Sequence, residues 1–185
     1  MTEDKDLTIN FFKSKQIEAR HFPKVNEGKK ADFELYLNNN LFGYCELKSI
    51  VEYDFVGERQ DPTYNKIQSK VHKSAKQLES VNSSHSVPNI VFFINHTKNV
   101  GWQDLWYVLT GQATPPNQPT VPVDLRYFSR LKKKGDFDII DYFIWKDVFN
   151  NIICFTINSS SKFATELKAA ISSKAYEIVS NNGNV

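Results

Sequence analysis

Two acidic residues and one lysine in the first third of the chain have the types and the spacing that phosphate chemistry requires. Asp32 precedes the tripeptide Glu46-Leu47-Lys48. Two carboxylates held close together repel each other unless one is protonated or a cation lies between them. A hard divalent cation such as Mg²⁺ or Mn²⁺ takes oxygen ligands and polarises a phosphoryl oxygen, while a nearby ammonium stabilises the developing charge. These residue types therefore suit metal-assisted hydrolysis of a phosphodiester.

The Glu-x-Lys spacing is not diagnostic by itself. It occurs four times, at Glu3/Lys5, Glu27/Lys29, Glu46/Lys48 and Glu166/Lys168. Only Glu46 and Lys48 lie on a predicted strand whose hairpin partner carries an aspartate on the same face. The alternative is an ordinary solvent-facing hairpin, in which Lys48 forms a cross-strand salt bridge with Asp32 or Glu34. The sequence leaves both interpretations open.

A β-hairpin is the element that would bring these side chains together. Apolar residues occupy alternate positions over residues 31–37 and again over residues 41–47, on either side of Asn38-Asn39-Asn40. Alternation with a period of two around an Asn-rich turn predicts two antiparallel strands. If the three asparagines form the loop, Leu37 faces Leu41, and all the apolar side chains share one face.

The same register places the candidate site on the other face of the hairpin. It pairs Asp32 with Glu46, and directly opposed side chains lie about 5 Å apart at Cβ. Lys48 follows two residues later on the same side. The sequence therefore predicts that the two acids and the lysine crowd one place.

The remaining segments predict an α/β arrangement around this hairpin. We expect helices at residues 2–14, 63–81, 102–109 and 162–179, and strands at residues 16–25, 89–95, 137–145 and 152–157. In the second helix, apolar residues recur at helical spacing and lysines take the opposite side. Residues 89–95 are apolar almost without a break, which predicts a central strand covered on both faces. Four prolines in residues 114–122 predict a loop.

The composition predicts a single intracellular domain. A chain of 185 residues can bury a core of its own. The longest strictly apolar run, residues 90–94, is too short to cross a bilayer, and the acidic start does not resemble a signal peptide. Cys45 and Cys154 lie in apolar segments and are expected to be buried thiols, so we expect a cytoplasmic protein without a membrane partner. The four histidines lack zinc-ligand spacing and are expected to be surface or satisfied residues.

Two basic clusters stand out in a chain whose net charge is only +2. The first recurs at helical spacing, at Lys66, Lys70, Lys73 and Lys76. The second is expected to form a phosphate-contacting ribbon that contains Arg126, Arg130, Lys132, Lys133 and Lys134. Such clusters indicate a polyanionic partner, above all nucleic acid, and the alternative for each is a solvated surface.

The motifs and their order resemble the PD-(D/E)xK nuclease superfamily, which has the restriction-endonuclease-like fold. The resemblance rests on Lys30-Ala31-Asp32-Phe33, on Glu46-Leu47-Lys48 and on Ala75-Lys76-Gln77-Leu78 within an amphipathic helix. The element order predicted for residues 2–95 is similar to the αβββαβ core of that family. The resemblance implies a central mixed sheet flanked by helices, with further strands and a helix over residues 97–185, in one domain of residues 1–185. Ala31 departs from the proline that the family often has at that position.

The resemblance also implies a role for each matching residue. Asp32 and Glu46 would bind Mg²⁺ or Mn²⁺, with help from the carbonyl of Leu47. Lys48 would be the catalytic lysine, and Gln77, together with Lys73, would approach from the helix. Many members add an acid from the first helix, and the candidates here are Glu3, Asp6 and, on the following strand, Glu18.

The sequence thus predicts a metal-dependent nuclease whose partner is nucleic acid, with DNA favoured over RNA. One alternative is a catalytically inactive member of the same fold that binds nucleic acid or a protein. Another is an unrelated α+β domain whose hairpin charges are only solvated. The choices between endonuclease and exonuclease, between sequence specificities, and between monomer and homodimer stay open.

Overall fold

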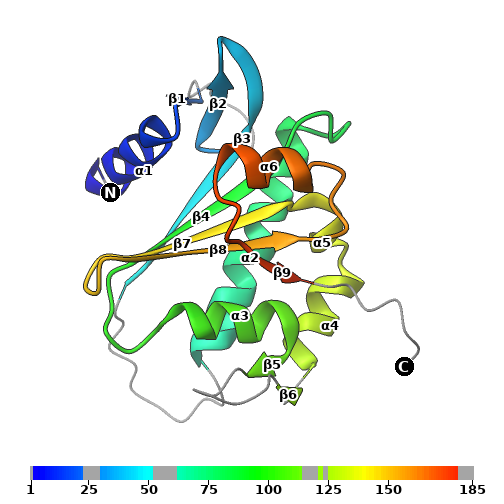
Figure 1. Cartoon of the computed structure of the whole chain (residues 1–185). Coiled ribbons are helices and arrows are strands. Elements are labelled where there is room, and N and C mark those ends of the chain that lie inside the picture. The colour runs from blue at the N-terminus through cyan, green and yellow to red at the C-terminus, as the bar shows by residue number, and fades with distance from the viewer. Residues whose placement is uncertain (1, 23–29, 52–61, 114–120, 123–124, 179–185) are drawn as a thin grey trace.

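A mixed seven-stranded sheet contains the hairpin predicted from the sequence. The computed structural model describes residues 2–22, 30–51, 62–113, 121–122 and 125–178. The strands lie in the order β1-β2-β3-β4-β7-β8-β9 (Figure 1). Their bounds are β1 (Ile17–His21), β2 (Phe33–Leu37), β3 (Asn40–Ile50), β4 (Asn89–Asn95), β7 (Tyr142–Asp147), β8 (Ile152–Asn158) and β9 (Tyr176–Ile178). A separate two-stranded sheet pairs β5 (Gln112–Ala113) with β6 (Val121–Pro122).

Helices lie against both faces of the large sheet, which confirms the predicted α/β class. They are α1 (Thr2–Ser14), α2 (Pro62–Val81), α3 (Trp102–Thr110), α4 (Arg126–Lys133), α5 (Asp136–Ile139) and α6 (Ala164–Ala170). Helices α2 to α5 pack on one face around Val91 and Phe93, and α1 and α6 pack on the other around Phe92 and Ile94. Because successive residues of β4 enter opposite clusters, the whole strand is buried, as predicted for residues 89–95.

The pairing directions make this a mixed sheet. β1, β2 and β3 form an antiparallel meander, and β3, β4 and β7 are parallel to one another. β7 pairs antiparallel with β8, and β8 pairs parallel with β9. Over residues 2–95 the elements follow in the predicted order, helix, three strands, helix and strand. No helix within the described ranges is long and apolar enough to span a membrane.

The prediction for the C-terminal segment is wrong in three places, and the first is Val121–Pro122, which is predicted as part of a loop but forms β6. Residues 136–139 form α5 instead of the start of a strand, and β7 begins only at Tyr142. Gly135, with φ of 72°, ends the preceding helical segment and allows the chain to turn into α5. The expected closing helix over residues 162–179 stops at Ala170, and residues 176–178 form β9 instead. Ser172 and Ser173 follow this helix, and serine side chains compete for the backbone bonds that would extend it.

Three other predicted segments reach beyond what the structure describes. The first strand, predicted for residues 16–25, is observed as β1 and ends at His21. Residues 23–25, 114–120 of the proline loop, and Val179 lie outside the described residues. Both cysteines are free thiols, Cys45 fully buried and Cys154 half-buried.

The hairpin has the predicted register next to the candidate site and a different one at its turn. Phe33 pairs with Cys45 and Leu35 with Gly43, as expected, but Leu37 pairs with Asn40. A β-bulge after Leu35 absorbs the difference of one residue. The loop therefore contains two residues and not three, because two successive asparagines with positive φ form the tight turn that matches the twist of a hairpin.

The turn residue Asn39 is a direct test of this explanation. Its φ is 64° and its side chain is exposed, so the residue contributes mainly through its backbone conformation. We expect Asn39→Ala to lower the free energy of unfolding by about 1 kcal/mol, because alanine tolerates the left-handed region poorly. Asn39→Gly is the matched control and should be at least as stable as the wild type in urea unfolding. Equal stability of Asn39→Ala and Asn39→Gly would contradict this role of the turn.

Candidate functional site

Glu46 and Lys48 lie side by side on β3, under α2. Two residues apart on a strand, they project from the same face of the sheet. The side chain of Glu46 is only 2% exposed and that of Lys48 is 15% exposed. Lys48 Nζ is ion-paired with Glu46 Oε1 and donates a hydrogen bond of 2.9 Å to Gln77 Oε1, which comes from α2. The strand and the helix thus hold the ammonium between a carboxylate and an amide oxygen.

Asp32 joins this group from the start of β2. Its Oδ2 accepts a hydrogen bond of 2.9 Å from the main-chain N–H of Leu47, between Glu46 and Lys48. Gln77 Nε2 also donates to the carbonyl oxygen of Lys30, at 3.2 Å. Gln77 therefore ties the segment that leads into Asp32 to the amine of Lys48. The structure brings together the four residues that the sequence predicts as catalytic.

Electrostatic strain is concentrated on Glu46. The pKa of its carboxyl is raised from 4.5 to about 7, chiefly by burial; the negative charge of Asp32 contributes to the increase and Lys48 opposes it. Glu46 Oε2 is buried and has no hydrogen-bond partner among the described residues. A buried polar oxygen without a partner is costly, so this atom marks a place where a ligand would relieve the strain.

The donor set fits a hard divalent cation. Asp32 and Glu46 contribute carboxylate oxygens, and one of those oxygens is orphaned. In the ranges that the structure covers, no three side chains of His, Cys, Asp or Glu gather in one place. Mg²⁺ commonly binds through one or two carboxylates and keeps waters for its other positions, so two acids are sufficient. Leu47 contacts the site through its N–H, and the role of its carbonyl stays a prediction.

None of the predicted N-terminal acids joins the site. Glu3 and Asp6 are exposed on α1, which packs on the opposite face of the sheet. Glu18 is exposed and forms an ion pair with Arg20 at 2.6 Å. In the described part of the chain, none of these three acids is hydrogen-bonded or ion-paired to Asp32, Glu46 or Lys48. The candidate site therefore has no acid from the first helix.

Three buried aspartates have histidine partners that sequence reasoning missed. The pairs are Asp4 with His96 at 2.7 Å, Asp136 with His72 at 2.8 Å and Asp141 with His85 at 2.8 Å. They confirm that these histidines are satisfied residues. In each pair the partners are more than 50 residues apart in the chain, so no local spacing announces them.

The lysines of α2 lead toward the site. Lys66, Lys70 and Lys73 are spaced by three or four residues, so they form a stripe along one side of α2. Gln77 continues the same row of side chains. Burial lowers the pKa of Lys70, and the charges of Lys48, Lys66 and Lys73 lower it further. The stripe is therefore close enough to Lys48 for the positive charges to interact.

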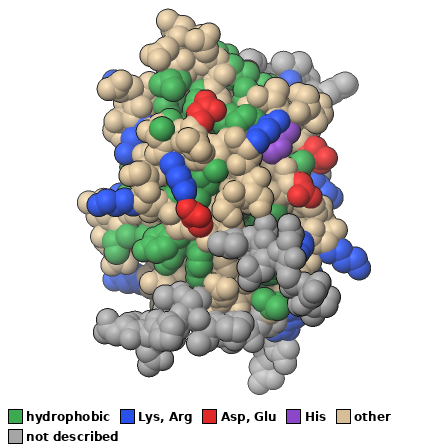
Figure 2. Space-filling model, turned by 45° about the vertical axis from the view of Figure 1, so that its right-hand side comes forward, with side chains coloured by type: hydrophobic (Ala, Val, Ile, Leu, Met, Phe, Trp, Pro, Cys, Tyr) green, Lys and Arg blue, Asp and Glu red, His purple; other side chains and the backbone are tan. Residues whose placement is uncertain are grey.

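The second basic cluster, predicted as a phosphate-contacting ribbon, lies mostly on helix α4, and its contact with phosphate stays a prediction. Arg126, Arg130, Lys132 and Lys133 belong to α4, Lys134 follows it, and all five side chains are exposed. α4 rests on α2, where Gln68 donates a hydrogen bond of 3.0 Å to the carbonyl of Tyr127. On the face shown in Figure 2, Lys and Arg side chains are dispersed among apolar and polar ones and form no continuous patch of described residues.

Comparisons with known proteins leave the site to be interpreted from its own geometry. No family model matches the chain. No curated protein and no solved structure matches it either.

Proposed function

We propose that the protein is a metal-dependent nuclease with a restriction-endonuclease-like core, which hydrolyses phosphodiester bonds in DNA in preference to RNA. The observation that carries the proposal is the orphaned oxygen of the buried Glu46 carboxylate, next to Asp32 and Lys48. Two neighbouring carboxylates repel each other in the absence of a ligand, and Lys48 offsets only part of that repulsion. A divalent cation bound by both carboxylates would remove the rest.

Each residue has a separate task in the proposed reaction. Asp32 and Glu46 would hold Mg²⁺ or Mn²⁺, with the Leu47 carbonyl as a further ligand. When bound, the ion would polarise the phosphoryl oxygen and activate the attacking water. Lys48 stabilises negative charge that develops on the phosphate oxygens, and Gln77 holds the Lys48 amine in place through the hydrogen bond of 2.9 Å. Preorganised donors in a half-buried site are worth more than the same groups in water.

The architecture supports the same proposal. The Glu46-Leu47-Lys48 tripeptide lies on the third strand of a helix-strand-strand-strand-helix-strand segment, and Gln77 comes from the helix that follows. This is the arrangement implied by the resemblance to the PD-(D/E)xK superfamily.

Nucleic acid is the proposed substrate because the site is flanked by cations. The stripe of Lys66, Lys70 and Lys73 approaches Lys48 from one side, and the exposed cations of α4 lie on the helix packed against α2. Contacts of this kind bind the phosphate backbone without regard to sequence and make the affinity depend strongly on salt.

A second candidate is a catalytically inactive nucleic-acid-binding protein with the same fold. It is favoured by the ion pair of Lys48 with Glu46, which neutralises part of the buried charge without any metal. The absence of a third acidic ligand among the described residues points the same way.

A cleavage assay on Asp32→Asn tests the proposed function. Purified protein is incubated with plasmid, linear duplex, single-stranded DNA and RNA, in Mg²⁺, in Mn²⁺ and in EDTA. We expect the wild type to cleave only with metal, and Asp32→Asn to cleave at least about 100-fold more slowly, because one ligand of the ion is lost. Glu79→Gln, which removes an exposed carboxylate from α2, is the control and should match the wild type.

Two outcomes would overturn the proposal in different ways. Undiminished cleavage by Asp32→Asn would show that the activity belongs to another site. A wild type that cleaves nothing, but binds labelled DNA with a steep dependence on salt, would favour the inactive binding protein.

A further inference from the structure

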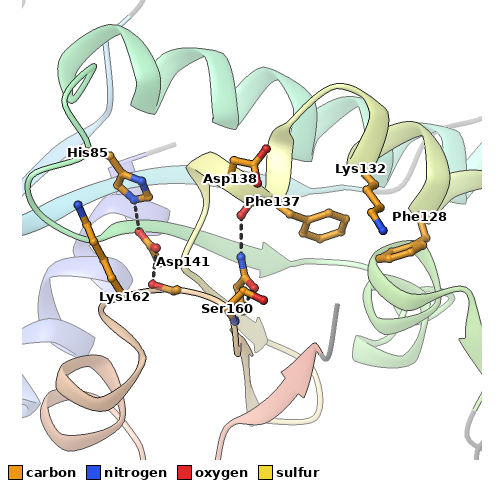
Figure 3. Close-up of a pocket in the computed structure, with 10 residues that line it drawn as sticks. His85, Phe128, Lys132, Phe137, Asp138, Asp141, Ser160 and Lys162 are labelled. Carbon is orange, nitrogen blue, oxygen red and sulfur yellow. Dashed lines mark hydrogen bonds and ion pairs between the residues drawn. The ribbon is translucent and has the colours of Figure 1, made fainter. Parts of the chain in front are cut away.

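A cavity lies away from the candidate site of Asp32, Glu46 and Lys48. It has a volume of about 440 Å³, within the usual range for small-molecule sites. Helices α4 and α5 form one wall, and the α2–β4 and β8–α6 connections form the other (Figure 3). Asp141, which lines the cavity, directly precedes β7. In the sheet, β7 is two strand spacings, about 10 Å, from β3, which carries Glu46. Its lining includes Lys132 of the second basic cluster and none of Asp32, Glu46, Lys48 and Gln77.

One end of the cavity carries positive charge. His85, Lys162 and Asp141 lie together there in Figure 3. Asp141 is buried and its oxygens are fully engaged: Oδ2 is bonded to His85 Nε2 and to the N–H of Asn89, both at 2.8 Å, and Oδ1 accepts from Ser161 Oγ at 2.5 Å. The Asp141 carboxylate is therefore satisfied by His85, Asn89 and Ser161, and it presents no unpaired acceptor to the cavity.

The other end of the cavity is aromatic. Phe128 from α4 and Phe137 from α5 have ring centroids 5.4 Å apart, and Lys132 lies beside them in Figure 3. Neither Lys132 nor Lys162 has a carboxylate partner in the part of the chain that the structure describes. The remaining acid, Asp138, is exposed at α5. Cations thus outnumber available carboxylates in a cavity that also offers two aromatic rings.

The cavity wall is braced by its own hydrogen bonds. Asn158 Nδ2 donates to the carbonyl of Phe137 at 2.6 Å, and Asn158 Oδ1 accepts from the N–H of Ser160 at 3.1 Å. These bonds connect the end of β8 with α5 across the cavity. Because these hydrogen bonds order the cavity wall before a ligand binds, little conformational entropy of the protein is lost on binding.

We propose that this cavity binds a nucleotide, with the base against Phe128 and Phe137 and the phosphate beside His85 and Lys162. Aromatic faces stack on bases of any sequence, an ammonium group binds phosphate, and an imidazole N–H can donate a hydrogen bond to it. The nucleotide is either a free mononucleotide or the end of a strand. The inference goes beyond the proposed nuclease, because it involves neither Glu46 nor a metal.

Titration calorimetry in EDTA with Glu46→Gln, which excludes cleavage, tests the proposal separately from the proposed activity. The probes are deoxyadenosine monophosphate, adenosine, and a short oligonucleotide with and without a 5′-phosphate. We expect the nucleotide to bind, and Lys162→Met to raise its Kd about tenfold, because one charged hydrogen bond is lost. Phe128→Ala should weaken binding similarly, and Lys13→Met, which removes an exposed lysine from α1 outside both basic clusters, should leave Kd unchanged.

The probes distinguish the two sources of the nucleotide. Tighter binding of the phosphorylated oligonucleotide than of the mononucleotide, again weakened by Lys162→Met, assigns the cavity to strand ends. Equal or tighter binding of the mononucleotide assigns it to free nucleotides. The proposal is overturned if no nucleotide binds, if adenosine binds as tightly as the nucleotide, or if Lys162→Met binds like Lys13→Met. Because Lys162 is exposed, its variant is expected to fold even if Phe128→Ala does not.

Discussion

Lys48→Met is expected to lower the rate of metal-dependent cleavage by at least about 100-fold without abolishing metal binding. The ammonium lies between Glu46 and Gln77, beside one of the two carboxylates proposed as metal ligands. Methionine retains most of the length of the lysine side chain but cannot stabilise charge on a phosphate. The variant therefore separates the stabilisation of the transition state from the binding of the ion.

The measurement pairs cleavage rates with Mn²⁺ affinities. Lys13→Met, which removes an exposed lysine from α1, on the opposite face of the sheet, is the control and should cleave like the wild type. Loss of the ion pair leaves Glu46 available to the metal, so the Mn²⁺ affinity of Lys48→Met should be equal to or higher than that of the wild type. Cleavage by Lys48→Met within a factor of about three of the wild type would contradict a catalytic role for this lysine.

Glu46→Gln is expected to remove a large pH dependence from the stability of the metal-free protein. The pKa of Glu46 rises from 4.5 to about 7 on folding, so the native state binds this proton more tightly than the unfolded state does. Its contribution is then fully favourable below pH 4.5 and is lost as the pH rises through about 7. The change from 4.5 to about 7 corresponds to about 3 kcal/mol. Glutamine, which resembles the protonated acid, lacks this dependence.

Urea unfolding in EDTA at acidic and at alkaline pH measures the effect. The free energy of unfolding of the wild type should fall by about 3 kcal/mol relative to Glu46→Gln as the pH rises. Groups that are common to both proteins, such as the buried Asp136, cancel in the difference. Mn²⁺ at alkaline pH should restore the stability of the wild type and leave the variant unchanged. If the free energies of unfolding of the two proteins changed in parallel with pH, folding would not raise the pKa of Glu46.

The hairpin shows how far alternation along a sequence can predict geometry. A period of two fixes which side chains share a face, so the grouping of Glu46 with Lys48 follows from the sequence alone. The size of the turn does not, because a bulge after Leu35 and a two-residue turn give the same register near Asp32 as a three-residue loop does. The candidate site depends only on the part of the register that both arrangements share.

The C-terminal part of the fold and the cavity of the further inference both depend on contacts between residues far apart in the sequence. β9 exists because it pairs with β8, and local sequence favours a helix over the same residues. His85 and Asp141 are 56 residues apart, and the aromatic end of the cavity comes from two further helices. Composition and spacing along the chain contain no signal for such a composite site.

A manganese soak of crystals of the protein would show whether Asp32 and Glu46 form a metal site. We expect anomalous density in contact with the carboxylate oxygens of Asp32 and Glu46, at the distances of about 2.0–2.3 Å typical of a small hard cation. The same density should be absent from crystals of Glu46→Gln. Carboxylates that remain without bound manganese at saturating concentration, with Lys48 still paired to Glu46, would mean that these residues form no metal site.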